Sequence, residues 1–516
     1  MQVTRRKSEI KQVILSIILL GIASLVIFPP ALVNEAPFWD DKAYINNALI
    51  ASGRLSPSDV RGPYAEERPP LFWWFLTGLY VLDAPVETAR LVSPVVTTIG
   101  LVAIFLLVSK LFDSVLAGFL ATTFTVSLNY FVSVTSYILT DSLGSVMAFV
   151  ALLTFSLGLR YGPFLWLSGG LTALSIIARD QNLLLIPVML LSFAWLAKTS
   201  KAVKLVYVGF LGMVGFAALY VRQEVFLQIL SDMLTPVVAD PFFIPLLSVF
   251  AIFSVLAVAK VAEQKNLLSR VPSIEERILD MLLAAAVMLF LLYPFFMDNI
   301  RLGAEYQIEG RGIFSRFVAH SIMVRGDIAR SGLDTGERVV FWLSSFPTLV
   351  TAPLLVLGVA GAVMALRNRV TLAKPLILWF VFTVVYIALF THIEYRFLVA
   401  AVIPVTVFAG YSVSLLAKRS KLAAAAVSVV VFIYAFSSVG VFGLVPSFES
   451  PTAVNGWMTL LGQRTPSDRW LTDYIAYLAD VQQEPKLMIP LVHVLTAMSS
   501  IVFLAATIYV GFRNPL

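Results

Sequence analysis

Long apolar runs separated by short polar segments dominate the chain. A lipid-facing helix needs about 20 apolar residues to cross the hydrocarbon core, because its backbone must satisfy its own hydrogen bonds there. The runs lack the strict alternation of a β-barrel and predict an all-α polytopic membrane protein with about 13 or 14 transmembrane helices. The predicted spans are residues 10–29, 88–109, 114–134, 139–159, 163–178, 182–197, 205–221, 242–259, 279–297, 341–366, 375–391, 397–417, 422–445 and 487–512.

Two further segments predict helices that do not cross the membrane. Residues 71–82 are too short to span a bilayer at about 1.5 Å of rise per residue, so we expect an interfacial or re-entrant helix. Residues 465–468 have the pattern of a helix start, and apolar side chains follow at helical spacing from Trp470 to Leu478. This second segment predicts a short amphipathic helix on the membrane surface or on other loops.

Lysine and arginine predict the orientation, because they concentrate in cytoplasmic loops. With the N-terminus inside, only Lys42 and Lys486 remain as external lysines. Residues 10–29 are long for a signal peptide and lack a small-x-small cleavage pattern, so we interpret them as a retained first helix. The chain is therefore expected in the plasma membrane, as a multi-pass protein with both termini in the cytoplasm.

The same topology divides the chain into three parts. Residues 1–445 are expected to form the transmembrane module, which includes a first external loop at 30–87 and an arginine-rich external loop at 298–340. Residues 446–486 would form a small external loop that carries the amphipathic helix. Residues 487–516 would supply the last span and the cytoplasmic C-terminus.

Composition excludes several functional classes. Hydrophobic residues make up 59% of the chain and charged residues 13%, unlike a soluble globular protein. The net charge of +6 comes from scattered clusters without a continuous basic stripe, so nucleic acid is not an expected partner. The chain has no cysteine, which removes disulfides and thiolate chemistry, and no Walker A, GxSxG or HExxH motif.

Paired carboxylates follow the first predicted span. Asp40 and Asp41 have aromatic neighbours, which is typical of the membrane interface, although helix capping accounts equally well for one of the acids. In the same loop, Glu67 and Arg68 precede two prolines. Asp40, Asp41 and Glu67 have the oxygen ligands for a divalent metal, but carboxylates alone do not select one, and no cofactor is required.

Other charged residues lie at predicted external ends. Asp141 begins a span, where it faces a cavity or caps the helix, since a central acid would cost about 2 to 3 kcal/mol. Arg179 precedes Asp180. The two residues form a local ion pair at the outer end of their helix, or they belong to the same cavity as Asp141. Loop 298–340 has six arginines, including Arg301, and no lysine. Arginine suits phosphate, whereas the interspersed acids leave a salt-bridged loop as the alternative.

A last polar group precedes the span at 397–417. It contains His392, Glu394 and Arg396. These side chains are able to contact a metal or a phosphate, but a single His–Glu pair does not define a metal site.

In order and spacing, these motifs resemble membrane-embedded C-type glycosyltransferases that use polyprenyl-phosphate sugar donors, the group with aminoarabinose transferases and protein mannosyltransferases. The resemblance covers the first span to about residue 200. Its motifs are Asp40-Asp41-x-x-Tyr44, Glu67-Arg68-Pro69-Pro70-Leu71, Leu139-Thr140-Asp141, the region of Arg179 with Pro187 and, more weakly, Arg396-Phe397 followed by Pro404. The Trp-Trp-Asp signature of oligosaccharyltransferases is absent, since Phe75 follows Trp73-Trp74.

The resemblance implies inverting sugar transfer on the external face, from a polyprenyl-phosphate donor to the hydroxyl of a lipid, glycan or protein acceptor, among membrane lipids. It maps the catalytic carboxylate of the first loop onto Asp40, and the basic residue before the prolines, usually lysine in aminoarabinose transferases, onto Arg68. The candidate catalytic residues are Asp40 and Asp141. The candidate phosphate ligands are Arg68, Arg179, Arg301 and Arg396, and the supporting residues are Asp41, Tyr44, Glu67, His392 and Glu394.

A transporter or lipid flippase is the main alternative, and a noncatalytic assembly subunit is a third. Transporters usually place charges near the bilayer midplane and contain repeats or broken helices there. Here the unusual polar residues gather at one predicted face, and no repeat is visible. The pattern therefore favours the transferase.

Overall fold

The fold is helical throughout the residues that the structure describes. The computed structural model describes residues 2–33, 39–61, 68–196, 223–238, 277–305, 312–332, 335–370, 373–391, 394–437, 460–462, 470–481, 502–504 and 507–509. No strand occurs within these ranges, which confirms the predicted all-α class. The predicted spans 205–221 and 242–259, and most of 487–512, lie outside them.

Several described helices have the length and composition of membrane spans. There are five such stretches, or up to seven if each of two bent helix pairs forms one span. The five are Ile10–Val33, Val86–Leu111, Asp141–Gly158, Asp280–Arg301 and Arg396–Arg419. Other predicted spans coincide with apolar helices of 10–17 residues. The structure thus supports a membrane protein, and the number of 13 or 14 spans stays a prediction.

The chain forms two compact units, which are described separately. Unit 1 comprises Met1–Val150, Val339–Ala373 and Tyr395–Leu516, and unit 2 comprises Ala151–Arg338 and Lys374–Glu394. Helices α7 (Asp141–Gly158) and α15 (Thr335–Val350) have residues in both units.

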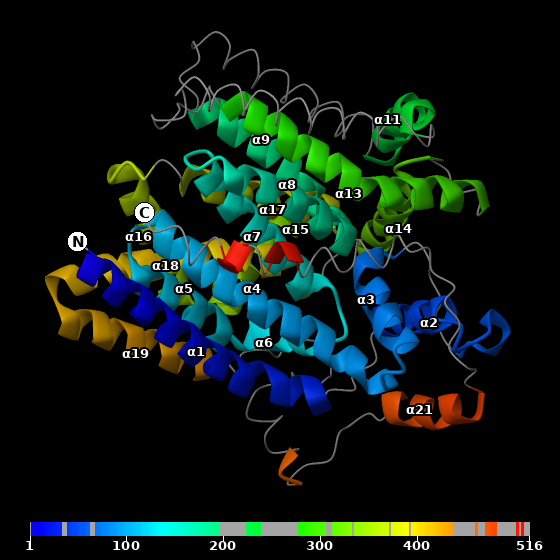
Figure 1. Cartoon of the computed structure of the whole chain (residues 1–516), viewed down its shortest axis with the longest axis horizontal. Coiled ribbons are helices and arrows are strands. Elements are labelled where there is room, and N and C mark those ends of the chain that lie inside the picture. Colours follow the sequence, from blue (N-terminus) through cyan, green and yellow to red (C-terminus); the bar gives the residue numbers. More distant parts are fainter. Residues whose placement is uncertain are drawn as a thin grey trace. The chain divides into compact units, whose positions relative to one another are not determined.

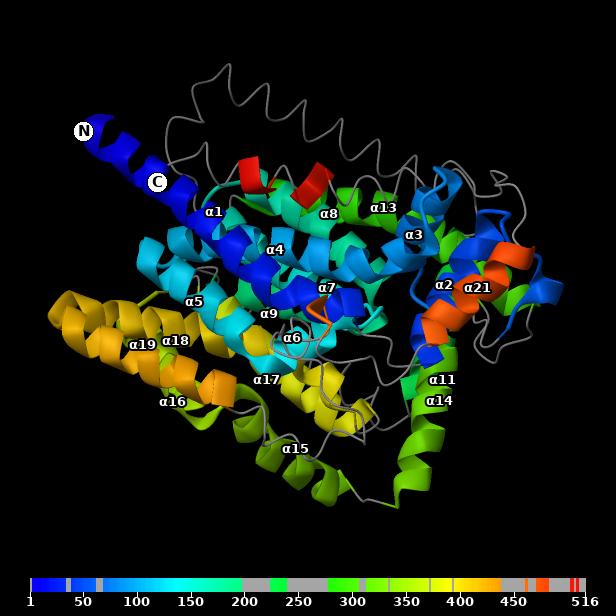
Figure 2. The same ribbon diagram turned by 90° about the horizontal axis from the view of Figure 1, so that it is seen from below.

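Unit 1 is built around α18 (Val399–Arg419), which packs against α5 (Val115–Ser127) and α16 (Ala352–Arg367). Helices α4 (Ala89–Leu111), α5 and α1 (Gln2–Val33) all pack against one another, and they run close together in Figures 1 and 2. The remaining elements are α2 (Trp39–Ala51), the 3₁₀ turns η1 (Pro57–Asp59) and η2 (Val86–Thr88), α3 (Pro70–Val81), α6 (Asn129–Ser136), the 3₁₀ turn η7 (Tyr395–Leu398), α19 (Lys421–Ser437) and α21 (Trp470–Val481).

Glycines allow the central helices of unit 1 to approach closely. A Cβ atom on Gly361 of α16 would overlap the backbone carbonyl of Phe408 in α18. A Cβ atom on Gly410 of α18 would lie 2.6 Å from the backbone nitrogen of Ala121 in α5. Membrane helices often associate through such small residues, because lipid offers no hydrophobic drive to bring them together.

Gly361→Ala is expected to destabilise the protein by about 1–3 kcal/mol, because the added methyl group forces two packed helices apart. Thermal unfolding in detergent measures the change. Gly21→Ala is the matched control, since a Cβ atom on Gly21 of α1 meets nothing within 4 Å. Alanine favours helix more than glycine does, so the control should melt no lower than wild type. Equal melting of the two variants would contradict close packing at Gly361.

Two predicted single spans are each broken into two helices. The predicted span 114–134 consists of α5 and α6, which meet at a bend of 68°. Leu128 between them has an extended backbone (φ −73°, ψ 113°), and this ends the helical hydrogen bonding of α5. The predicted span 341–366 is interrupted at Thr351, whose φ of 68° is left-handed, just before α16 begins. Hydropathy alone does not detect such breaks, since the apolar run continues through both.

Helix α21 rests on the segment around α2. Tyr474 of α21 donates a 2.5 Å hydrogen bond to Asn46 Oδ1 on α2, and Tyr477 donates one of 2.7 Å to the carbonyl of Asp59. The Arg61 guanidinium lies 3.7 Å from the centroid of the Tyr477 ring. Figure 1 shows α21 beside α2. The structure confirms the amphipathic helix predicted from residue 470 and places it on other segments of the chain.

Unit 2 contains α8 (Pro163–Ala178), the 3₁₀ turn η3 (Asp180–Leu184), α9 (Leu185–Leu196), α11 (Gln223–Val238), α13 (Ile278–Glu305), α14 (Ser315–Ser331) and α17 (Lys374–Phe390). Helix α8 packs on α13, α11 on α14, and α9 on α17. The indole Nε1 of Trp166 on α8 donates to Asp280 on α13 at 3.1 Å.

Residues 223–238 are helical, and so is most of the predicted external loop 298–340, where the apolar runs predict no helix. Helix α11 occupies the first, and α13, α14 and α15 occupy most of the second. The side chains of Ser231 and Thr235 on α11 accept hydrogen bonds of 3.4 Å from the backbone of Phe314 and Ile313, just before α14. Helix α14 has three arginines and one aspartate among its 17 residues, so a search for uniformly apolar runs does not find it.

Candidate active site

Asp40 is held by two arginines that are far from it in sequence. Its Oδ1 lies 2.8 Å from Nη2 of Arg68, and its Oδ2 lies 2.9 Å from Nη1 of Arg396. The side chain of Asp40 is 11% exposed, that of Arg68 is 18% exposed and that of Arg396 is 15% exposed. Such partial burial strengthens the attraction between charges relative to bulk water. The three residues all belong to unit 1.

Local sequence features place these three side chains. Asp40 lies in the first turn of α2, where the positive end of the helix dipole favours a carboxylate. Arg68 precedes Pro69, and Pro70 begins α3 at a position where proline is well tolerated. Arg396 lies in η7, directly before α18. The starts of three helices thus supply the ion-pair cluster.

Asp141 joins the same cluster through Arg396. Nη1 of Arg396 is 3.9 Å from Oδ2 of Asp141, a side chain that is only 3% exposed. Asp141 is the first residue of α7. Arg396 therefore stands between two carboxylates, Asp40 and Asp141, and is the residue that links the first segment of unit 1 to α18.

Asp41 and Tyr44 lie on the buried side of α2. Asp41 is 2% exposed, and burial, with a smaller contribution from the charge of Asp40, raises its pKa well above the usual range. The backbone N–H of Ile138 donates a hydrogen bond to Asp41, whereas its Oδ1 has no hydrogen-bond partner within the described ranges. The Tyr44 hydroxyl lies 3.3 Å from Thr140 Oγ1, and burial raises the pKa of Tyr44. Asp41 therefore favours its protonated form more than an exposed aspartate does.

The other described candidates belong to unit 2. Nε of Arg179 donates to Gln181 Oε1 at 2.9 Å. Arg301 is 48% exposed and pairs with Asp298 at 3.0 Å. Glu394 is half-buried. Glu67 and His392 lie outside the described residues.

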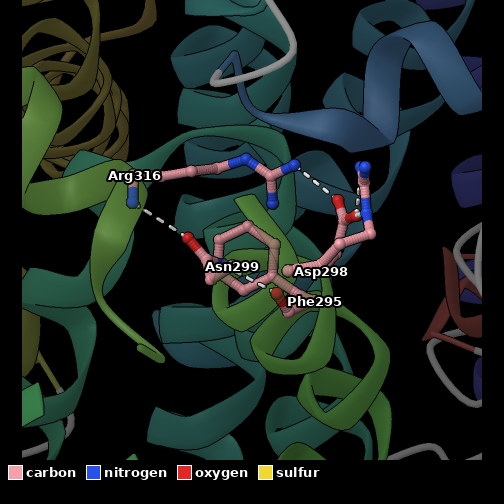
Figure 3. A network of polar contacts seen from close by, with 5 residues as sticks. Phe295, Asp298, Asn299 and Arg316 are labelled. Atoms are coloured by element: carbon pink, nitrogen blue, oxygen red, sulfur yellow. Dashed lines mark hydrogen bonds and ion pairs between the residues drawn. The ribbon is translucent and has the colours of Figure 1, made fainter. Parts of the chain in front are cut away.

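Unit 2 also contains a buried charge cluster that the sequence did not single out. Nη2 of Arg316 lies 2.5 Å from Oδ2 of Asp298, and its backbone N–H donates to Asn299 Oδ1 at 3.0 Å (Figure 3). The Arg316 guanidinium is 5.3 Å from the centroid of the Phe295 ring and is almost fully buried. Arg301 and Arg316 therefore both form salt bridges with Asp298, as in the alternative of a salt-bridged segment 298–340.

A divalent metal does not fit the described part of the Asp40 cluster. Guanidinium groups engage both oxygens of Asp40 and place positive charge where a cation would have to bind. Across the described ranges, no group of three or more His, Cys, Asp or Glu side chains is arranged to hold a metal ion. Glu67, the third predicted ligand, lies outside those ranges.

The sequence identified the members of the cluster but not the ion pairs that join them. It predicted Asp40 as a catalytic residue and both Arg68 and Arg396 as phosphate ligands, without an ion pair between the aspartate and the arginines. It also missed the contact from the Ile138 backbone to Asp41. The motif Leu139-Thr140-Asp141 contains a signal for one further contact. Thr140 is a polar residue beside Asp141, and its hydroxyl contacts that of Tyr44.

Comparison with known proteins finds similarity in structure only. No family model and no curated protein sequence matches the chain. The archaeal oligosaccharyltransferase AglB from Archaeoglobus fulgidus, solved with an inhibitory peptide and a dolichol-phosphate, is 14% identical over 95% of this chain and 56% of that one, with a TM-score of 0.44.

Two further crystal structures of an Archaeoglobus fulgidus oligosaccharyltransferase are also similar. One is tethered to an acceptor peptide with the NVT sequon (12% identity, 98% of this chain, TM-score 0.42), and one is in the apo form (11%, 94%, 0.41). This chain spans 56% of the length of each. At TM-scores below 0.5 these neighbours carry no argument about activity, which rests on the residues of the cluster.

Proposed function

We propose that this chain is a multi-pass membrane glycosyltransferase with about 13 or 14 spans. It transfers a sugar from a polyprenyl-phosphate donor to the hydroxyl of a lipid, glycan or protein acceptor, with inversion. The observation that carries the proposal is the position of Asp40 between Arg68 and Arg396. One carboxylate and two phosphate-binding side chains are the groups that this reaction needs in one place.

The two arginines provide a binding site for the donor phosphate. Guanidinium groups bind phosphate through a planar fork of donors, and partial burial strengthens the attraction. A bound phosphate competes with Asp40 for these donors, because all three groups share the same space. As Arg68 and Arg396 turn to the phosphate, the carboxylate of Asp40 is released to accept a new hydrogen bond.

The released carboxylate acts as a general base. Asp40 takes the proton from the acceptor hydroxyl, whose oxygen forms a bond to the anomeric carbon of the sugar. The bond from that carbon to the phosphate oxygen breaks, and the polyprenyl phosphate leaves with the electron pair. Attack from the side opposite the leaving group inverts the anomeric carbon. The arginines stabilise the charge that develops on the phosphate.

Asp141 and Asp41 have supporting roles in this proposal. Asp141 orients Arg396 by sharing its guanidinium with Asp40. Asp41, in the adjacent position of α2, binds acceptor or donor through its buried carboxyl group. Arg179, Arg301 and Glu394 remain proposed contacts, as do Glu67 and His392.

Helix α18 supports an external site. It is 21 residues long, which corresponds to about 31 Å, the thickness of the hydrocarbon core. Arg396 precedes its first residue, whereas Lys418 and Arg419 lie in its last turn. Because basic residues favour the cytoplasmic side, the Asp40 cluster belongs at the outer surface of the plasma membrane.

The decisive experiment incubates the purified full-length protein with a panel of polyprenyl-phosphate sugars and a membrane extract, and identifies labelled products by mass spectrometry. The expected result is one sugar on one acceptor class, with release of polyprenyl phosphate. Movement of the lipid across proteoliposomes without sugar transfer would favour a flippase instead. No labelled product from any donor, with protein that melts cooperatively, would contradict the transferase.

A further inference from the structure

A groove lies between α5, α18 and α19 at the end of unit 1 where α18 terminates. Its volume is about 480 Å³. Helices α5 and α19 both pack on α18 (Figure 2), and residues of all three helices line the groove. All three helices belong to unit 1.

The mouth of the groove is positively charged. Lys418 and Lys421 line it, and Arg419 lies between them in sequence. Asp113 precedes the lining residue Ser114 in sequence and carries one negative charge. The three positive charges of Lys418, Arg419 and Lys421 therefore outnumber it. Lys418, Arg419, Lys421 and Asp113 are all exposed.

Two helices begin at this mouth. Ser114 precedes α5 and accepts a 3.2 Å hydrogen bond from the backbone of Ala117, and Ser420 accepts one of the same length from Ala423 in α19. The positive ends of both helix dipoles therefore lie near the lysines. Helix N-termini and lysines together favour an anion.

The inner walls of the groove are apolar. Leu116 and Leu120 come from α5, and Val413 and Ala424 from the other two helices. Along the length of α19, the side chains of Leu422, Val429 and Ile433 are 82%, 54% and 59% exposed. An occupant must therefore combine an anionic head with an apolar chain.

This groove is separate from the Asp40 cluster. Arg396 precedes α18, whereas Lys418 lies in its last turn. The 21 residues of the helix place the two ends about 31 Å apart. A donor phosphate bound by Arg396 cannot reach the lysines.

We propose that the groove binds an anionic phospholipid, with its phosphate at Lys418 and Lys421 and one acyl chain against the apolar walls and the exposed face of α19. Basic residues near a membrane surface attract anionic lipids by about 1 kcal/mol each. The site is independent of sugar transfer, and its occupant holds α5 and α19 against the end of α18.

Native mass spectrometry and thermal melting of delipidated full-length protein test this site, with phosphatidylglycerol and phosphatidylcholine added in turn. Wild type should retain phosphatidylglycerol and melt at a higher temperature with it than with phosphatidylcholine. Lys418→Gln with Lys421→Gln should weaken phosphatidylglycerol binding by about thirtyfold, because two charges of about 1 kcal/mol each are lost. The variant should melt like wild type without lipid, since both side chains are exposed.

The matched control is Arg367→Gln with Arg369→Gln. These residues are exposed at the end of α16, which lies beside the end of α18 because Asn368 Nδ2 donates to the Tyr411 hydroxyl at 3.0 Å. The control removes the same charge outside the groove and should bind phosphatidylglycerol like wild type. Equal loss in both double variants, or none in the lysine variant, would overturn the proposal. Equal stabilisation by inorganic phosphate would exclude the acyl-chain contact.

Discussion

Asp40→Asn is expected to lower sugar transfer from a polyprenyl-phosphate donor by about 10²–10⁴-fold, because asparagine cannot take the acceptor proton. The amide keeps the shape of the side chain and one oxygen for the arginines, so donor binding should change far less than turnover. Product formation under single-turnover conditions, with bound donor measured separately, distinguishes the two effects.

The matched control for this substitution is Asp480→Asn, an exposed acid on α21 in the same unit. It should transfer sugar at the wild-type rate. Thermal melting of both variants checks that each is folded. Turnover close to wild type in folded Asp40→Asn protein would remove Asp40 from the mechanism.

Arg396→Ala is expected to abolish transfer and also to destabilise the protein by about 3–5 kcal/mol. This side chain lies between Asp40 and Asp141, so its loss leaves two largely buried carboxylates without the cation that they share. Unfolding in denaturant measures the stability, and titration with a labelled polyprenyl-phosphate sugar measures donor binding.

Arg68→Ala provides the comparison, because Arg68 pairs with Asp40 whereas Arg396 lies near both Asp40 and Asp141, and because Arg68 is slightly more exposed. It should weaken donor binding by about 10–100-fold, which corresponds to roughly 1.4–2.8 kcal/mol, with a smaller loss of stability. Arg396→Lys keeps the charge but not the planar fork, and should recover more stability than turnover. Unchanged donor affinity in Arg68→Ala would remove the phosphate role, and wild-type stability in Arg396→Ala would show that the shared ion pair contributes little.

Some members of the cluster could be recognised from their positions in the sequence. Asp40, Arg68 and Asp141 are charged residues beside apolar segments, where an uncompensated charge is costly, so each one attracts notice without a structure. Asp298 and Arg316 did not stand out in the same way. They lie in segments where charges are common, and only the packing of α13 and α14 makes them buried.

The same physical distinction separates the helices that the sequence predicted from those that it missed. Uniform apolar runs such as 88–109 and 397–417 predicted α4 and α18 well, because a lipid-facing or buried helix is apolar on every side. The bend between α5 and α6 and the helices within 298–340 were missed. The bend depends on the backbone angles of a single residue, and the helices within 298–340 are buried on one side only. The mean hydropathy of a segment does not report either feature.

By itself the sequence determined an all-helical membrane protein, the short helix after Pro69 and the amphipathic helix from Trp470, since hydropathy and turn residues act locally along the chain. Only the tertiary structure decided that Arg396 reaches both Asp40 and Asp141 and that Arg68 binds the other oxygen of Asp40. These residues are separated by tens to hundreds of positions. Their contact depends on how the starts of α2, α3, α7 and α18 pack together, which no local pattern encodes.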